Sequence, residues 1–237
     1  MAVSVDTVYQ RVLALANKEQ RGYITPQEFN LLANQVQMDI FEQYFYDLNQ
    51  FKRIPGNNTL YADPVDIIQA KIELFHDSRS IGPQSNNWFD LPDDCYRLAQ
   101  VRYNNPTLGY GVEVEKLTHR ELSVAQNSPL TAPTLSRPTY YVKETNGGIQ
   151  LIVKPNTIDE IDVNYIKKPI EVEWNYVEID NDPLYDQGSS THFELHDSEE
   201  VNLVIRILAL AGVVITDPGL YQLATTEDQK STQQEKQ

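Results

Sequence analysis

The spacing of the apolar residues changes twice along this chain of 237 residues, and it limits the possible folds more than any other feature. Toward both ends the apolar residues recur at every third or fourth position, which is the period of an amphipathic helix. In the middle they alternate with polar residues, which is the period of a half-buried strand. We therefore predict an α+β fold, in which an antiparallel β domain is inserted into a helical domain formed by the N- and C-terminal helices.

The strongest helix signal lies at residues 25–28. Thr25 suits the capping position, Pro26 suits the first helical position, and Glu28 completes a capping box. The helix that follows has a wide apolar surface, to which three aromatic residues contribute: Phe41, Tyr44 and Phe45. Such a helix must bury more than one side. We expect these three residues to lie at an interface with a neighbouring subunit as well as against the helical domain.

The middle of the chain has the pattern of an antiparallel sheet. Two alternating segments, 139–142 and 149–153, flank an Asn-Gly-Gly sequence at 146–148, which predicts a hairpin. A further strand is predicted at 161–166. These strands are too few for a parallel α/β sheet, so we predict a small antiparallel sandwich or barrel-like sheet. The predicted boundaries are 1–76 and 192–237 for the helical domain and 77–191 for the β domain.

The charge of the chain limits its partners. There are 19 Lys and Arg residues against 34 Asp and Glu residues, which gives a formal net charge of −15. The basic residues are scattered, so the chain lacks the basic patch of a nucleic-acid or anionic-membrane binder. An acidic surface still permits DNA to slide past without sticking. The single cysteine, Cys95, excludes an intramolecular disulfide and a thiolate metal cluster.

The C-terminal part contains a second helical region. The apolar run at 201–215 is shorter than the ~20 residues of a membrane span, and Arg206 interrupts it, so we predict a buried helix and no contact with a membrane. Asp217 and Pro218 start a last helix, followed by a polar tail that cannot bury itself in a core. We expect this end to bind a partner protein through three residues: Leu220, Tyr221 and Leu223.

One segment has the residue types of a metal site. On a strand, His192, Glu194 and His196 would share one face, and two imidazoles with a carboxylate can hold Zn²⁺. This spacing leaves a metal-dependent hydrolase open as an alternative. A polar strand face that leads into a helix is the favoured interpretation, because the order of the residues differs from the known zinc-protease motif.

Other catalytic and cofactor motifs are absent from the sequence. Asp180, Asp182 and Asp186 resemble the start of a calcium loop, but the later ligand positions carry Leu184 and Thr191. There is no phosphate-binding loop, dinucleotide fingerprint or nucleophile elbow. We therefore assign no catalytic, cofactor-binding or metal residue, expect no cofactor, and predict that the chain is not an enzyme.

Two segments resemble virion proteins of tailed phages. Residues 17–30, NKEQRGYITPQEFN, are similar to the opening of structural proteins in crAss-like phages. Residues 88–98, WFDLPDDCYRL, resemble the strand-entry segment of head–tail adaptors from short-tailed phages. The predicted layout of terminal helices around a β insert is similar to those adaptors over the whole chain.

This resemblance implies a structural role. Such adaptors form a ring, commonly of twelve copies, that docks beneath the portal protein in the neck of the virion and surrounds the DNA channel. It implies contacts with other copies of the chain, with the portal and with downstream tail proteins, and no catalytic residues. Because the sequence shows no signal peptide, we expect the chain to assemble in the host cytoplasm. We expect its final location to be the virion. Another tail or capsid-associated component is the alternative virion role.

Overall fold

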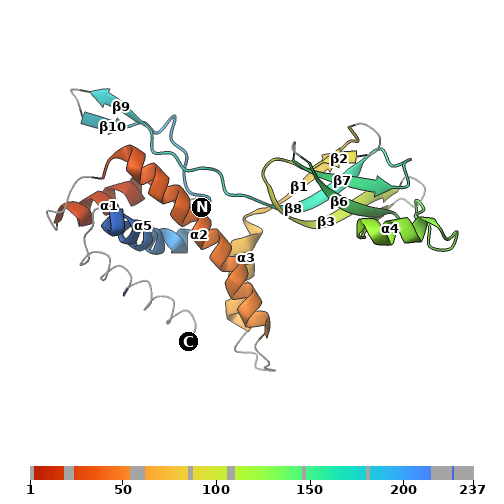
Figure 1. Cartoon of the computed structure of the whole chain (residues 1–237). Helices are drawn as coiled ribbons and strands as arrows, with labels where there is room; N and C mark the ends of the chain where they lie inside the picture. Colours follow the sequence, from red (N-terminus) through yellow and green to blue (C-terminus); the bar gives the residue numbers. More distant parts are fainter. Residues whose placement is uncertain are drawn as a thin grey trace. The chain divides into compact units, whose positions relative to one another are not determined.

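The protein is described by a computed structural model (Figure 1) that covers residues 3–18, 24–53, 62–84, 88–105, 110–145, 148–179, 182–214 and 226. It has helices toward both ends of the chain and mainly antiparallel sheets between them, so the predicted α+β fold is confirmed. The chain divides into two compact units. Unit 1 consists of Met1–Leu74 and Pro169–Gln237, and unit 2 is Phe75–Lys168.

Unit 1 contains four of the described helices: α1 (Val5–Lys18), α2 (Pro26–Arg53), α3 (Ala62–Glu73) and α5 (Glu200–Val214). Both α1 and α2 pack on α5, and α3 packs on α2. The start of α2 is the predicted capping box, in which Thr25 N and Oγ1 both donate to Glu28 Oε2 while Glu28 N donates to Thr25 Oγ1. Among these described helices, none is both long and apolar enough to cross a membrane.

Side-chain amides on α2 hold an extended segment of the chain. Asn30 Oδ1 accepts a hydrogen bond from Trp174 N at 2.9 Å, and Asn30 Nδ2 donates to Trp174 O at 3.3 Å. Asn34 pairs in the same way with Val172, at 2.7 and 2.9 Å. Four helical residues rise about 6 Å and two extended residues rise about 6.6 Å. The spacings therefore match, and the two amides act as an amide ladder for the main chain.

Gln37 continues this ladder by one more turn of α2. Its Nε2 donates to Ile170 O at 2.7 Å, and its Oε1 accepts from Glu194 N at 3.2 Å. The ladder explains why residues 169–191 belong to unit 1, whereas the sequence placed them in the β domain. An extended segment that pairs with helix side chains has the same sequence pattern as a strand. The boundary between the units therefore lies after Lys168 rather than after residue 191.

Two short strands follow the ladder: β9 (Tyr176–Ile179) and β10 (Asp182–Tyr185). They form a two-stranded antiparallel sheet. Trp174 is fully buried at its base, where its ring stacks on Tyr176 and Tyr185 with centroid distances of 5.7 Å to each. The indole Nε1 donates to Asp6 Oδ1 at 3.1 Å. These contacts fix the base of the hairpin to the helices of unit 1.

The described residues of unit 2 form two four-stranded sheets and one helix. One sheet has the order β1-β8-β3-β4 and the other β2-β7-β6-β5. All strand pairs are antiparallel except β5 and β6. The elements are β1 (His76–Ile81), β2 (Trp88–Asp90), β3 (Cys95–Asn105), β4 (Tyr110–Glu113), β5 (Glu115–Lys116), α4 (His119–Gln126), β6 (Thr139–Thr145), β7 (Gly148–Lys154) and β8 (Ile161–Lys167).

The predicted hairpin is present as β6 and β7, where Thr145 pairs with Gly148. Gly148 has a φ of 120°, which is a conformation that glycine adopts easily. At the other end of unit 2, Lys167 N donates to Phe75 O at 2.8 Å. The first residue of this unit and the residue before its last are therefore joined directly by a main-chain hydrogen bond.

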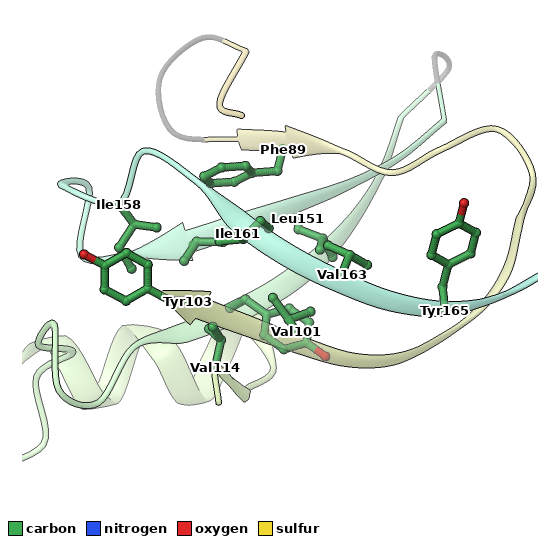
Figure 2. Close-up of a cluster of buried hydrophobic side chains, with 11 residues drawn as sticks. Phe89, Val101, Tyr103, Val114, Leu151, Ile158, Ile161, Val163 and Tyr165 are labelled. Carbon is green, nitrogen blue, oxygen red and sulfur yellow. The ribbon is translucent and has the colours of Figure 1, made fainter. Parts of the chain in front are cut away.

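The core of unit 2 lies between its two sheets. Figure 2 shows the side chains that converge there from strands of both sheets. The buried cluster consists of Phe89, Val101, Tyr103, Val114, Tyr140, Leu151, Val153, Ile158, Ile161, Val163 and Tyr165. Phe89 enters from β2 in one sheet and faces Ile161 and Val163 from β8 in the other. This shared core makes the unit a small sandwich, which is one of the two predicted sheet architectures.

Candidate functional site

The aromatic residues predicted at a subunit interface lie mainly inside unit 1. Phe41 is fully buried and Tyr44 nearly so, whereas Phe45 is half-buried and packs edge-on against Phe41 at 5.1 Å between ring centroids. Both α3 and α5 pack on α2, so the chain's own helices cover part of its wide apolar surface. Phe41 and Tyr44 therefore pack within unit 1, as expected for one side of this helix, and their contact with a neighbouring subunit stays a prediction.

The residues predicted to bind a partner at the C-terminus cannot be placed. Leu220, Tyr221 and Leu223 lie outside the described residues. The predicted buried helix before them is present as α5, which buries Leu203 and Ile207 completely. Its apolar run is therefore part of the core of unit 1.

A pocket of about 550 Å³ opens between α2, α3 and the start of α5. We call it the α2–α3 pocket. Its apolar walls include Ile40, Tyr44, Phe51, Ile67, Ile68 and Ala70, and its polar residues are Gln43, Asp47, Lys71, His196, Ser198, Glu199 and Asn202. Pockets of this size with apolar walls and a few polar groups are typical binding sites. Tyr44, which the sequence placed at an interface, forms part of this wall.

A nearly buried ion pair forms the polar part of the pocket. Lys71 Nζ donates to Glu199 Oε1 at 2.6 Å, and the ammonium also lies over the Tyr44 ring, 5.5 Å from its centroid. Burial acts to raise the pKa of Glu199, but hydrogen bonds from Lys71 and Asn202 outweigh it, so the pKa lies below its ordinary value of 4.5. Glu199 is therefore ionised at neutral pH.

The ion pair belongs to a longer hydrogen-bond network. Asn202 Nδ2 donates to Glu199 Oε2 at 3.0 Å, and Arg206 Nε donates to Asn202 Oδ1 at 2.9 Å. Arg206 also donates to the side-chain carbonyl of Gln43 on α2. The network joins α2, α3 and α5 through polar side chains, which fixes how these helices pack around the pocket.

The three residues of the possible metal site do not converge. His192 Nδ1 accepts from Val5 N at 3.3 Å, and Glu194 Oε2 accepts from Ile170 N at 3.1 Å. His196 instead caps the short helix η2 (Asp197–Glu199), where its Nδ1 accepts from Ser198 N at 3.2 Å. Nowhere in the described part of the chain do three His, Cys, Asp or Glu side chains lie close enough together to hold a metal ion. The segment has a local structural role instead.

The acidic loop likewise forms a turn. Asp186 Oδ1 accepts from Gly188 N at 3.0 Å, and Oδ2 accepts from Ser189 Oγ at 2.8 Å. These hydrogen bonds hold the pKa of Asp186 below its ordinary value. The third carboxylate of the calcium-like pattern is thus engaged in capping the turn that follows β10.

Unit 2 holds a second group of titratable residues. Tyr165 Oη donates toward Asp77 Oδ2 at 3.1 Å and lies 3.2 Å from Asp94 Oδ1. Arg79 pairs with Asp94 at 3.1 Å. Burial of the phenol, helped by the two carboxylates, raises the pKa of Tyr165 above its ordinary value of 10. The group joins β1 to the turn before β3, and it has the character of a structural anchor.

The two units carry very different charges. Unit 1 contains 23 of the 34 acidic and 9 of the 19 basic residues, which gives a net charge of −14. Unit 2 contains the other 11 acidic and 10 basic residues and has a net charge of −1. Almost all of the net negative charge of the chain therefore belongs to the helical unit. The overall composition concealed this difference because it averages the two.

Sequence reasoning missed the α2–α3 pocket because its parts are far apart in the chain. Lys71 and Glu199 are 128 residues apart, and no local pattern pairs them. One signal was available. Lys71 lies between Ile68 and Ile72 in the sequence of α3, and a lysine among apolar residues of a helix indicates either an exposed position or a buried partner.

Comparisons with known proteins do not assign a function to this chain. No protein-family model matches the sequence, and no curated protein matches it. A functional proposal therefore rests on the resemblance of segments 17–30 and 88–98 to phage virion proteins, the division into two units, the charge of each unit and the surfaces described above.

Proposed function

We propose that this chain is a structural protein of a tailed-phage virion, and more specifically a head–tail adaptor. In this role several copies form a ring in the neck that joins the portal protein to downstream tail proteins and surrounds the DNA channel. The observation that supports it best is the architecture, in which both ends of the chain form one helical unit and an antiparallel β unit is inserted between them. This is the layout that the resemblance of segments 17–30 and 88–98 implies.

The electrostatics of the chain are compatible with this role. A DNA channel must let the phosphate backbone pass without holding it, and a strongly acidic surface repels phosphates. With a net charge of −14, unit 1 has that property. The chain then contacts DNA only in passage and has no membrane or cofactor among its partners.

The α2–α3 pocket also supports a binding role. Three of its polar residues are engaged with one another, because Lys71 pairs with Glu199 and Asn202 donates to Glu199. Mostly apolar walls suit the capture of an apolar side chain, as in the central contacts of protein interfaces. Such a pocket favours assembly with proteins over catalysis.

The proposal is tested with the full chain and the portal protein encoded in the same genome. The two are co-expressed and purified, and their complex is weighed by native mass spectrometry and imaged by electron cryomicroscopy. We expect a ring of this chain on one end of the portal. A monomer that neither binds the portal nor occurs in purified virions contradicts the proposal. A chain that occurs in virions away from the portal is instead a tail or capsid-associated component.

A further inference from the structure

The outer face of the β9–β10 hairpin carries two exposed apolar residues. Val177 and Leu184 lie directly opposite each other in the register of the two strands, and they are 53% and 59% exposed. Tyr176 and Tyr185 form the neighbouring pair and stack on buried Trp174. Successive residues of a strand face opposite sides. The hairpin is thus anchored through one face and presents an apolar pair on the other, which we call the hairpin face.

The hairpin face lies in the most acidic stretch of the chain. Residues 169–205 contain ten Asp and Glu residues and no Lys or Arg. Glu173 is exposed at the base of the hairpin, and Glu178 is exposed on strand β9. An apolar pair with an acidic surround fits a partner with an apolar centre and basic residues around it. A partner surface that is itself acidic at the point of contact would be repelled.

Unit 2 presents a surface with this complementary chemistry. Leu130, in the turn after α4, is 91% exposed, and Val124 on α4 is 65% exposed. Arg120 is exposed and lies one helical turn before Val124, so both side chains point to the same side of α4. Exposed Lys116 precedes the helix. We call these four residues the α4 surface.

The charge and rigidity of the α4 surface suit such a contact. Between residues 116 and 143 the chain has four basic residues and one acidic residue, Glu121. Glu121 is engaged in the capping box of α4, where it accepts from Thr118 N at 2.8 Å. Thr131 Oγ1 donates to Ala125 O at 3.0 Å, which holds the turn of Leu130 against the end of the helix. The exposed leucine is therefore presented on a fixed turn.

We propose that the hairpin face of one copy packs on the α4 surface of a second copy of this chain. Val177 and Leu184 would bury their apolar surface against Val124 and Leu130, and the surrounding acidic residues would face Arg120 and Lys116. The contact uses different surfaces on the two copies, which is the type of interface that builds rings. This inference deepens the proposed function, and rests on it, because it names the contact that joins neighbouring copies of the ring.

The test uses the full chain and two variants with one altered surface each. Leu184→Lys places a cation in the hairpin face, and Leu130→Asp places an anion in the α4 surface. Both positions are exposed, so the fold should be retained, which circular dichroism checks. Light scattering during gel filtration should show an assembly for the parent chain and a monomer for each variant. Raising the salt from about 0.05 to 0.5 M should weaken the parent assembly, because it shortens the screening length severalfold.

Mixing the two variants gives the decisive result. The Leu130→Asp copy keeps an intact hairpin face, and the Leu184→Lys copy keeps an intact α4 surface. One functional contact can therefore form between them and no further copy can add. We expect a dimer with twice the 27.2 kDa mass of one chain. The matched control is Leu31→Lys, at an exposed position on α2, which should assemble as the parent does.

The inference is overturned if the parent is monomeric at the highest concentration reached, if either variant assembles like the parent, or if the mixture stays monomeric. These outcomes are distinct from a failure of the proposed function. A ring on the portal that forms equally well with Leu184→Lys and Leu130→Asp contradicts this contact and leaves the adaptor role intact. A contact that forms in a chain that is absent from virions contradicts the adaptor role alone.

Discussion

Lys71 Nζ lies 2.6 Å from Glu199 Oε1, and only 14% and 5% of the two side chains are exposed. A buried pair of this kind is a strong constraint, because removal of one partner leaves the other charged and without compensation. The pair also connects α3 to η2, which leads into α5, at the α2–α3 pocket. The packing of α3 on this segment therefore involves two residues that are far apart in the sequence.

Lys71→Met should lower the free energy of unfolding of unit 1 by about 3 kcal/mol, since Glu199 loses its cation inside the protein. The double variant Lys71→Met with Glu199→Gln removes both charges and should recover about half of that loss or more. Denaturant unfolding followed by Trp174 fluorescence measures both, with Trp88 replaced by Phe to isolate the signal of unit 1. Equal stability of the single variant and the parent would show that the ion pair contributes nothing.

Acid should weaken unit 1 through the same pair. The pKa of Glu199 is lowered in the folded protein, so the folded state binds fewer protons than the unfolded chain in the range below 4.5. The stabilisation is present above that range and is lost as the pH falls through the folded pKa. Denaturation midpoints measured between pH 6 and pH 3 should therefore fall less steeply for Glu199→Gln than for the parent.

Asn34→Ala should destabilise unit 1 by about 2 kcal/mol, because it leaves the buried N–H and carbonyl groups of Val172 without partners. Gln35→Ala, at an exposed position on the same helix, is the control and should change the stability by less than about 0.5 kcal/mol. The same fluorescence unfolding experiment compares the two. A similar effect of both substitutions would mean that the amide ladder does not hold the segment.

Tyr165→Phe should make unit 2 less sensitive to alkali. Burial raises the pKa of the Tyr165 phenol, so the folded state keeps a proton that the unfolded chain loses above pH 10. Stability from this group is fully present below pH 10 and falls as the pH rises beyond it. The guanidinium midpoint of unfolding is measured at pH 8 and at pH 11 by Trp88 fluorescence, with Trp174 replaced by Phe in both proteins. The change in midpoint between the two pH values should be smaller for Tyr165→Phe than for the parent.

The α2–α3 pocket should bind an apolar fluorescent probe. Anilinonaphthalene sulfonate has a suitable size for about 550 Å³ and should brighten when it enters the pocket. Ala70→Trp narrows the pocket from an exposed position on α3 and should reduce that signal by about half or more. Leu31→Trp, on α2 outside the pocket, should leave the signal unchanged. An equal signal in all three proteins would mean that the probe binds elsewhere.

Local patterns in the sequence predicted local structure well. In the capping box Thr25 contacts Glu28, and in the β6–β7 hairpin Thr145 pairs with Gly148. Each feature is specified by residues within a few positions of one another. The division into a helical and a β region followed from the change in apolar spacing. The boundary after Lys168 did not, because the ladder depends on pairing between Asn30 and Trp174, which are 144 residues apart.

The exposure of side chains could not be predicted from local patterns, for a related reason. Exposure depends on which distant element covers a side chain, so the sequence could not show that the chain's own helices bury Phe41 and Tyr44. The exposed pair Val177 and Leu184 alternates with inward-facing residues like any strand of a sheet. The exposed fractions of these two side chains show that this face of the hairpin lies open.

The hydrogen bond from Lys167 N to Phe75 O has a consequence for how this chain can change. Phe75 and Lys167, at the two ends of unit 2, lie side by side. For the rest of the chain, the insert therefore connects two neighbouring points. Lengthening such a link costs little entropy once its ends are joined, and inserted domains with adjacent termini are well tolerated. Unit 2 can therefore be lengthened or shortened in its loops while the host unit keeps its core.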